Sequence, residues 1–274
     1  MSARVEVNGA ELKSCCAAAY ESDFARLLLG GSFHPGGLEL TARLGERLHL
    51  APRDRVLDVA CGRGDSAISL AQRFGCRVTG IDFGRANIAE AQSRAEQEQV
   101  ADLVRFETGD AERLDYPDAS FDVVVCECAY CTFADKRAAA REFIRVLAPG
   151  GRLGLSDLTR SGSLPAELSG LLAWIACIGD ARPAAEYVAH LEMAGFESVL
   201  AEAHDDALAG MVRDIQARLL ATELMVKLEK VNLPGVEFRE ANALAASAAQ
   251  AVRSGVLGYA IITATKPLAI KPCG

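Results

Sequence analysis

The sequence predicts an α/β fold built on a doubly wound, parallel sheet. From Arg55 onward, short runs rich in β-branched residues alternate with helical stretches. Strands that alternate with helices in this way form βαβ units, whose right-handed crossovers place helices on both faces of a parallel sheet. The chain has 274 residues, of which 50% are hydrophobic, so it can fill such a core. We find no repeat with a period of about 20 to 50 residues, which excludes solenoids and propellers.

The core elements follow one another between residues 55 and 203. We expect strands at RVLDVAC, CRVTGIDF, LVRFETGDA, FDVVVCECA and RLGLSDL. The intervening helices are SAISLAQRFG, RANIAEAQSRAEQEQ and KRAAAREFIRVLAPGG. A further helix over 183–194 should end at Gly195, a common helix terminator, and the strand FESVLAEA should follow it.

Two segments lie outside this core. Residues 1–50 contain the loop SFHPGG and an amphipathic helix from about Leu38 to Leu48. Residues 204–255 carry apolar side chains at helical spacing, which predicts two or three helices. Two roles are open for these helices: a cap over a substrate pocket, or extra packing and a dimer surface. We therefore predict a single domain over 1–274, with an N-terminal cap segment 1–50, a cofactor-binding core 51–203, a helical insert 204–255 and a final strand 256–267.

Charge and hydropathy narrow the classes of partner. The formal net charge is −8 and no run of Lys or Arg occurs, which argues against a surface for nucleic acid or anionic membrane. The longest apolar stretch, residues 168–179, is shorter than the roughly 20 residues of a membrane helix and predicts a buried helix. Because no secretory signal is visible, we expect a cytoplasmic protein.

A strand, a glycine turn and a helix at residues 56–65 predict a nucleoside site. Gly62, Gly64 and Ala67 fit the relaxed GxGxxA fingerprint, so a nicotinamide dinucleotide is one alternative. Asp58 and Asp65 would repel a pyrophosphate, however, whereas the ammonium and sulfonium groups of S-adenosylmethionine favour nearby carboxylates. The charge pattern therefore favours S-adenosylmethionine as the cofactor.

Two further acids follow the next two strands. Asp82 ends the second strand, where a carboxylate can accept hydrogen bonds from both ribose hydroxyls. Asp110 follows the third strand and can accept from the exocyclic amine of adenine. Since the carboxyl ends of parallel strands meet at one edge of a sheet, we expect these acids to share one pocket with Asp58.

In this order and spacing, the segments VLDVACGRG, GIDF, GDAERLDYPDASFDVVV and FIRVLAPGGRLGLSD resemble the class I S-adenosylmethionine-dependent methyltransferases. The resemblance covers residues 55 to about 200 and implies a methyltransferase with a seven-stranded Rossmann-like sheet, whose last strand, GYAIITATK, is antiparallel. It implies a cofactor site formed by Asp58, Gly62 and Gly64 at the methionine part, Asp82 at the ribose, and Asp110 and Ala111 at the adenine. We also expect Ala60, Phe83 and Cys126 beside the cofactor.

The cysteine pattern resembles a narrower family, the arsenite methyltransferases, in a less characterised bacterial branch. Cys128 precedes the pair Asp135-Lys136, and Cys177 precedes Gly179-Asp180-Ala181. The resemblance implies that Cys128, Cys177 and a third thiol, from Cys15 or Cys16, hold trivalent arsenic or a related soft metalloid as the substrate, with a thiol reductant as a partner and no resident metal. Soft trivalent arsenic favours thiolates, and its methylation needs alignment rather than a general base.

Other assignments remain open at this point. The nine cysteines do not suit a disulfide scaffold in a reducing compartment. We expect Cys61 and Cys76 in the core and leave Cys131 and Cys273 unassigned. His34 or Glu127 would serve as a general base if the acceptor were a small organic molecule methylated on carbon or oxygen. A non-catalytic metalloid-binding protein is less favoured, because the cofactor acids are intact.

Overall fold

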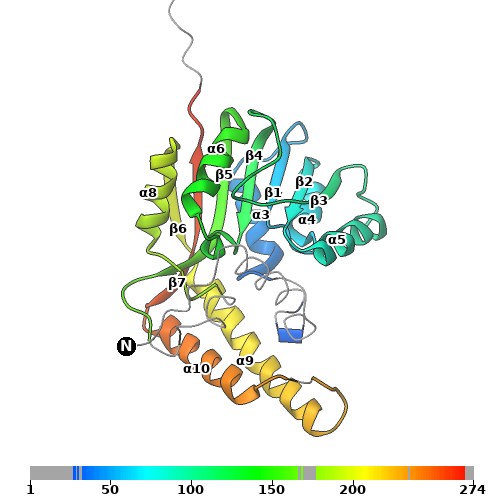
Figure 1. Ribbon diagram of the computed structural model, residues 1–274, viewed down its shortest axis with the longest axis vertical. Coiled ribbons are helices and arrows are strands. Elements are labelled where there is room, and N and C mark those ends of the chain that lie inside the picture. The colour runs from blue at the N-terminus through cyan, green and yellow to red at the C-terminus, as the bar shows by residue number, and fades with distance from the viewer. Residues whose placement is uncertain are drawn as a thin grey trace, which may run out of the picture.

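A computed structural model describes residues 27, 28, 30, 33–165, 168, 177–233 and 235–268. They form a seven-stranded sheet with the order β3-β2-β1-β4-β5-β7-β6 (Figure 1). The strands are β1 Arg55–Val59, β2 Arg77–Asp82, β3 Val104–Thr108, β4 Phe121–Glu127, β5 Leu147–Arg160, β6 Glu197–Ala203 and β7 Leu257–Thr265. Strands β1 to β5 pair in parallel, and β7 runs antiparallel to both β5 and β6.

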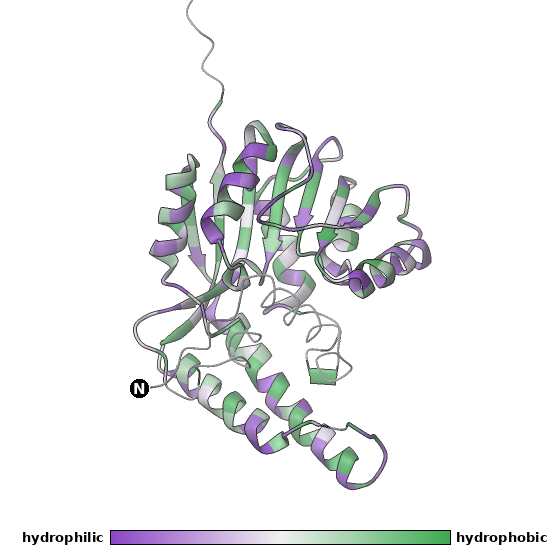
Figure 2. Cartoon of the chain, in the orientation of Figure 1, coloured by the Kyte–Doolittle hydropathy of each residue, from purple (hydrophilic) through white to green (hydrophobic). Residues whose placement is uncertain are grey.

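Helices cover both faces of this sheet. They are α3 Gly37–Arg47, α4 Asp65–Phe74, α5 Arg85–Gln97, α6 Lys136–Val146, α8 Ala184–Ala194, α9 Asp205–Lys227 and α10 Phe238–Arg253, with the 3-10 turn η1 Tyr130–Thr132. Apolar side chains of α3, α4 and α5 pack into one hydrophobic core, and those of α6 and α8 pack into a second one. Figure 2 shows that the strands between these two layers are largely hydrophobic, as expected of a sheet that is covered on both faces.

Helix α3 packs closely on β5. Leu40, Leu44 and Leu48 follow one another at four-residue intervals and are all buried. The side chains of Leu44 and Leu48 lie over Gly154, where an added Cβ would come within 2.7 Å of a methyl carbon of each leucine. A glycine at this strand position therefore lets the helix approach the sheet.

Helices α9 and α10 form a hairpin that extends from the sheet edge where the parallel strands end (Figure 1). Asp205, the first residue of α9, accepts a hydrogen bond at 2.9 Å from the backbone N–H of Tyr259 in β7. Leu208, Val212 and Leu219 of α9 are buried, whereas Leu220 and Leu224 are exposed. The hairpin thus joins the main core at its base and projects beyond it.

The predicted fold class is confirmed. The helix expected from about Leu38 to Leu48 is α3, and the helix expected over 183–194 is α8, which ends at Gly195 with a φ of 102°. The insert predicted over 204–255 forms two helices within 205–253, and the final strand spans 257–265. Most of the apolar stretch 168–179 lies outside the described residues.

One boundary was wrong. The sequence predicts that the helix KRAAAREFIRVLAPGG continues through LAPGG, but α6 ends at Val146 and Leu147 already pairs with Phe121 of β4. Pro149 cannot donate a helical hydrogen bond, so the chain leaves the helix before it. Within the described parts of the chain, no helix combines the length and the apolarity needed to cross a membrane.

Substitution of Gly154 by Ala should destabilise the protein, because the new methyl group overlaps two buried leucines. We expect a loss of about 1 to 3 kcal/mol in the free energy of unfolding, measured in urea. Gly210 of α9 is the matched control: its added Cβ would meet no atom closer than 3.9 Å. Gly210→Ala should stabilise the helix by up to about 1 kcal/mol. Equal effects of the two substitutions would contradict the packing of α3 on β5.

Candidate active site

A pocket opens at the edge of the sheet where β1, β2 and β4 end. Its walls come from the turn between β1 and α4, from residues that follow β2 and β3, from the end of β4 and from Phe33 and His34. Of the residues predicted to contact a cofactor, seven line this pocket: Asp58, Ala60, Gly62, Asp82, Phe83, Asp110 and Ala111. The fold therefore brings the predicted nucleoside site together.

The turn after β1 is bent so that its backbone faces the pocket. Ala60 and Gly62 both have positive φ values, of 59° and 53°. The N–H of Gly62 donates to Asp82 Oδ2 at 2.9 Å, which fixes the turn against the end of β2. Gly64 has a different role from the one expected: a Cβ there would lie 2.6 Å from the Phe106 ring, and the residue does not line the pocket. Glycine suits this position because its φ is 81° and because the Phe106 ring lies close to it.

Asp58 is the most unusual side chain of the pocket. It is only 2% exposed, and its Oδ2 atom has no hydrogen-bond partner among the residues that the structure describes. Burial raises the pKa of Asp58 well above its usual value, and the negative charges of Glu127 and Asp82 raise this pKa further. A buried carboxylate oxygen without a partner favours the binding of a cation or of a hydrogen-bond donor.

The other two predicted acids are already oriented by the chain. Asp82 Oδ1 accepts from the N–H of Gly84 at 2.7 Å and from Asn87 Nδ2 at 3.2 Å. Asp110 Oδ1 accepts from the N–H of Glu112 at 3.0 Å. These bonds hold both carboxylates at the pocket wall, and carboxylate oxygens are the acceptors that hydroxyl and amine donors need.

Asp65 does not contribute as expected. We expected its charge to repel a pyrophosphate, but Arg94 pairs with it at 2.6 Å and Arg63 lies 4.0 Å away. Of the two acids, Asp58 is therefore the one whose negative charge bears on the choice of cofactor. The ammonium and sulfonium groups of S-adenosylmethionine fit the unpartnered Asp58 oxygen, and a nucleoside fits Asp82 and Asp110.

Glu127 ends β4 and lines the same pocket. Its side chain is 4% exposed, and its two oxygens have different environments. Oε2 accepts hydrogen bonds from Ser66 Oγ at 2.6 Å and from Thr41 Oγ1 at 2.9 Å. Among the described residues, Oε1 accepts only one hydrogen bond, a longer one of 3.4 Å from Ser156 Oγ. Oε1 is thus the oxygen with more capacity to accept a further hydrogen bond.

His34 is placed as a donor rather than as a base. Thr41 and Ser66 each have a single hydroxyl proton, which points to Glu127, so their oxygens can only accept from His34 Nε2 at 3.3 and 3.5 Å. His34 Nδ1 lies 3.3 Å from the carbonyl oxygen of Pro35, which is also only an acceptor. His34 Nε2 also lies 3.8 Å from Glu127 Oε2. Of the two predicted bases, Glu127 is therefore the better placed.

Three thiols meet beside this end of β4. The Cys177 thiol lies 3.2 Å from the carbonyl oxygen of Cys128 and donates to it. A hydrogen bond with the Cys177 thiol is the main cause that raises the pKa of Cys128, and burial adds to it. Burial, followed by a hydrogen bond with Cys177, raises the pKa of Cys131. Cys128 and Cys131 therefore favour the protonated state at neutral pH.

The structure changes several cysteine assignments. Cys131, which we left unassigned, belongs to this thiol cluster (Cys128, Cys131 and Cys177). Cys126, expected beside the cofactor, is fully buried in the core with α6 and α8 and does not line the pocket. Cys61 is buried as expected but also lines the pocket, and Cys76 is a core residue. Cys15, Cys16 and Cys273 lie outside the described residues.

Sequence reasoning also missed the residues that surround Glu127. Thr41 comes from α3, Ser66 from α4 and Ser156 from β5, so their convergence depends on the packing of three separate elements. No local pattern marks them. Cys131 did have a signal, because Cys128-Ala129-Tyr130-Cys131 is a C-x-x-C spacing that places two thiols on one turn.

The pocket geometry agrees with the comparisons to known proteins. Residues 56–151 match the family model of a methyltransferase domain. The 27-O-demethylrifamycin SV methyltransferase of Amycolatopsis mediterranei (strain S699) is 41% identical over 167 residues. That match covers 60% of this chain and 61% of the relative's length.

Solved structures share the fold. The [4+2]-cyclase SpnF matches with a TM-score of 0.74 and 24% identity over 98% of this chain and 100% of its own. The Haemonchus contortus phosphoethanolamine N-methyltransferase 2, solved with phosphomonomethylethanolamine and S-adenosylhomocysteine, matches with a TM-score of 0.78 and 19% identity over 93% of this chain and 60% of its own. Chains of this fold thus include a methyltransferase that holds the demethylated cofactor.

Replacement of Asp58 by Asn should weaken binding of S-adenosylhomocysteine by about 10- to 100-fold, because the ammonium loses a charged acceptor. Calorimetry of the purified protein measures this change. Because cofactor binding favours ionised Asp58, whose pKa is raised in the free protein, binding to the parent should release a proton and should strengthen as the pH rises. Unchanged affinity in Asp58→Asn would contradict the assigned role.

The same substitution should not destabilise the free protein at pH 8. The pKa of Asp58 is higher in the folded protein than its ordinary value, so the folded state binds more protons and loses stability as the pH rises through that interval. Asn removes this loss. We expect the melting temperature of Asp58→Asn at pH 8 to equal or exceed that of the parent, and a marked drop would contradict the electrostatic account.

Proposed function

We propose that this protein is an S-adenosylmethionine-dependent methyltransferase that acts on a small organic acceptor. The observation that carries the proposal is the position of Glu127, at the end of β4 in the same pocket as Asp58, Asp82 and Asp110. A carboxylate beside the cofactor acids can take a proton from an acceptor hydroxyl. The similarity to a methyltransferase named for 27-O-demethylrifamycin SV supports an organic acceptor.

In this proposal each residue has a defined task. S-adenosylmethionine supplies an electrophilic methyl group on a sulfonium. Asp58 binds the ammonium, Asp82 orients the ribose, and Asp110 with Ala111 receives the adenine. Glu127 Oε1 accepts the hydroxyl proton of the acceptor, while Ser66 and Thr41 hold Oε2. His34 Nε2 lies 3.8 Å from Oε2, on the side of the carboxylate held by Ser66 and Thr41.

A second candidate is methylation of trivalent arsenic, and the thiol cluster is the observation that favours it. Three neutral thiols and arsenous acid condense to an As(III) trithiolate and three waters, with no change in net charge. Such a reaction suits buried thiols whose pKa values are raised. The described residues include no group of three such side chains already placed around one ion, so the three thiols would have to move together to share one arsenic atom.

This candidate differs from the prediction in its third ligand. Cys131 lies within the cluster, whereas Cys15 and Cys16 lie outside the described residues. We therefore assign Cys131 as the third ligand of a metalloid site. A thiol reductant would be needed to keep the three cysteines reduced. The organic acceptor remains the first proposal, because the reported relatives are named for organic substrates.

An acceptor panel separates the two candidates. The purified protein is incubated with methyl-labelled S-adenosylmethionine, reductant and one of three acceptors: 27-O-demethylrifamycin SV, phosphoethanolamine or arsenite. Methylation of an organic acceptor without methylated arsenic supports the first proposal, and the converse supports the second. S-adenosylhomocysteine binding without transfer to any acceptor would contradict both as stated.

Glu127→Gln should lower kcat for an organic acceptor by about 10²- to 10⁴-fold, because the amide cannot take the proton. The affinity for S-adenosylhomocysteine should change little, which calorimetry checks. Glu46→Gln, which alters an exposed pair with Arg73, is the control and should behave like the parent. A Glu127→Gln variant that turns over at the parental rate would exclude Glu127 as the base.

For the arsenic candidate, Cys128→Ser, Cys131→Ser and Cys177→Ser should each abolish arsenite binding and leave the affinity for S-adenosylhomocysteine close to that of the parent. Arsenite binding is measured by calorimetry under reductant. The buried core thiol Cys76 is the control, and Cys76→Ser should retain arsenite binding. Full binding by Cys131→Ser would contradict the assignment of the third thiol.

A further inference from the structure

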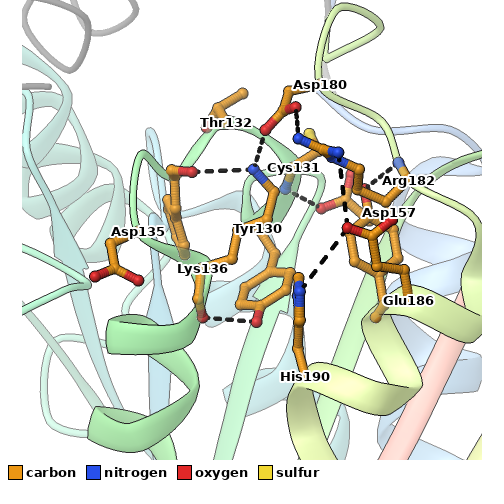
Figure 3. Close-up of polar contacts among 12 residues, drawn as sticks. Tyr130, Cys131, Thr132, Asp135, Lys136, Asp157, Asp180, Arg182, Glu186 and His190 are labelled. Atoms are coloured by element: carbon orange, nitrogen blue, oxygen red, sulfur yellow. Dashed lines mark hydrogen bonds and ion pairs between the residues drawn. The ribbon is translucent and has the colours of Figure 1, made fainter.

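An ion pair that the reaction does not use joins two segments beside the pocket. Lys136 begins α6 and is only 7% exposed, and its Nζ donates to Asp180 Oδ2 at 2.6 Å (Figure 3). The same ammonium donates to the carbonyl oxygen of Phe133 at 3.0 Å. Lys136 therefore connects the loop that follows β4 with the segment 177–182. Neither Lys136 nor Asp180 lines the pocket.

The segment 177–182 is anchored on its other side as well. Asp180 and Arg182 form an ion pair, and Arg182 lies 3.6 Å from Glu186 of α8. The backbone N–H of Arg182 donates at 3.0 Å to the hydroxyl of Tyr187, which donates to the carbonyl oxygen of Leu158 in β5 at 3.2 Å. The segment is thus held to α8 and β5, and the Lys136–Asp180 pair completes the link to the end of β4.

Backbone strain lies at both places that this link holds together. Cys128 and Cys177 have φ values of 53° and 62°, a left-handed conformation that L residues rarely adopt. Such a conformation costs of the order of 1 to 3 kcal/mol at each residue and persists only where the surroundings enforce it. The hydrogen bond from the Cys177 thiol to the Cys128 carbonyl joins the two strained residues directly.

The loop after β4 also forms part of the pocket. Cys128, Thr132 and Phe133 line it, and Phe133 is the residue whose carbonyl oxygen binds Lys136. A shift of the 177–182 segment would therefore release the wall of the pocket that follows Glu127. A buried ion pair often adds little stability compared with apolar side chains, so its effect on position is separable from its effect on folding.

We propose that Lys136 and Asp180 are positioning residues for the acceptor side of the pocket. Their ion pair holds segment 177–182 against the end of β4 and so keeps Cys177 in contact with Cys128. The same pair thereby fixes the pocket wall formed by Cys128, Thr132 and Phe133. The juxtaposition of the two cysteines does not depend on which acceptor is methylated. That the wall contacts the acceptor rests on the proposed function.

The test uses the full-length protein and a double variant, Lys136→Met with Asp180→Leu, which replaces the pair by apolar side chains. Dibromobimane, a bifunctional reagent that links neighbouring thiols, reports whether Cys128 and Cys177 remain adjacent, and mass spectrometry identifies the linked peptides. Asp180→Asn, which removes the charge at constant size, serves as a second variant. Arg152→Met removes a comparable ion pair with Asp54, at 2.9 Å, beside the loop that precedes β1, and is the matched control.

We expect the parent and Arg152→Met to link Cys128 to Cys177. In the double variant and in Asp180→Asn, the rate of linking between Cys128 and Cys177 should fall at least about tenfold, while the affinity for S-adenosylhomocysteine stays unchanged. With any acceptor of the panel that is methylated, kcat/KM for the acceptor should fall by a similar factor while KM for S-adenosylmethionine stays constant.

Two results would overturn the proposal: a parent protein in which Cys128 and Cys177 do not link, or variants that link them as fast as the parent. Thiol linking needs no acceptor. It therefore still tests the position of segment 177–182 if none of the acceptors in the panel is methylated. If linking slows but kcat/KM is unchanged, the pair positions the thiols and the claim about the acceptor wall is overturned.

Discussion

Three carboxylates, those of Asp58, Asp82 and Glu127, meet where β1, β2 and β4 end, and their mutual repulsion is the constraint on which the site depends. Hydrogen bonds from the chain hold Asp82 and Glu127. Asp58 has an oxygen with no such bond among the described residues, and its burial together with the charges of Glu127 and Asp82 raises its pKa. A cationic ligand relieves both the missing bond and the repulsion, so the site favours a cofactor that carries positive charge over one that carries a pyrophosphate.

The sequence was sufficient to predict most of the fold and the cofactor half of the site. The regular alternation of strands and helices determines the sheet, and the acids that follow β1, β2 and β3 are adjacent because parallel strands end at one edge. Local sequence could not separate two kinds of glycine: Gly62 faces the pocket, whereas Gly64 makes room for Phe106. It also could not reveal that Arg94, 29 positions beyond Asp65, neutralises that acid.

The acceptor half was harder to predict because its groups come from distant elements. Hydroxyls of α3, α4 and β5 surround Glu127, and no pattern along the chain marks their convergence. The alternation of side chains along β4 explains the error at Cys126: Val124 and Cys126 face the core with α6 and α8, whereas Val125 faces the opposite core. In the sequence, Lys136 and Asp180 stand out only because each follows a cysteine at a characteristic spacing. In the folded chain they bind each other. Residues that mark a family by spacing can thus have a physical role that only the folded chain reveals.

The central claim is that the acidic edge of the sheet binds S-adenosylmethionine through Asp58. A crystal structure of the protein with S-adenosylhomocysteine tests it most directly, because the position of the amino group is then observed. The account predicts the amino nitrogen within about 3.2 Å of Asp58 Oδ2, with the ribose hydroxyls on Asp82. An amino group directed away from Asp58, with its Oδ2 atom still unpartnered, would contradict it.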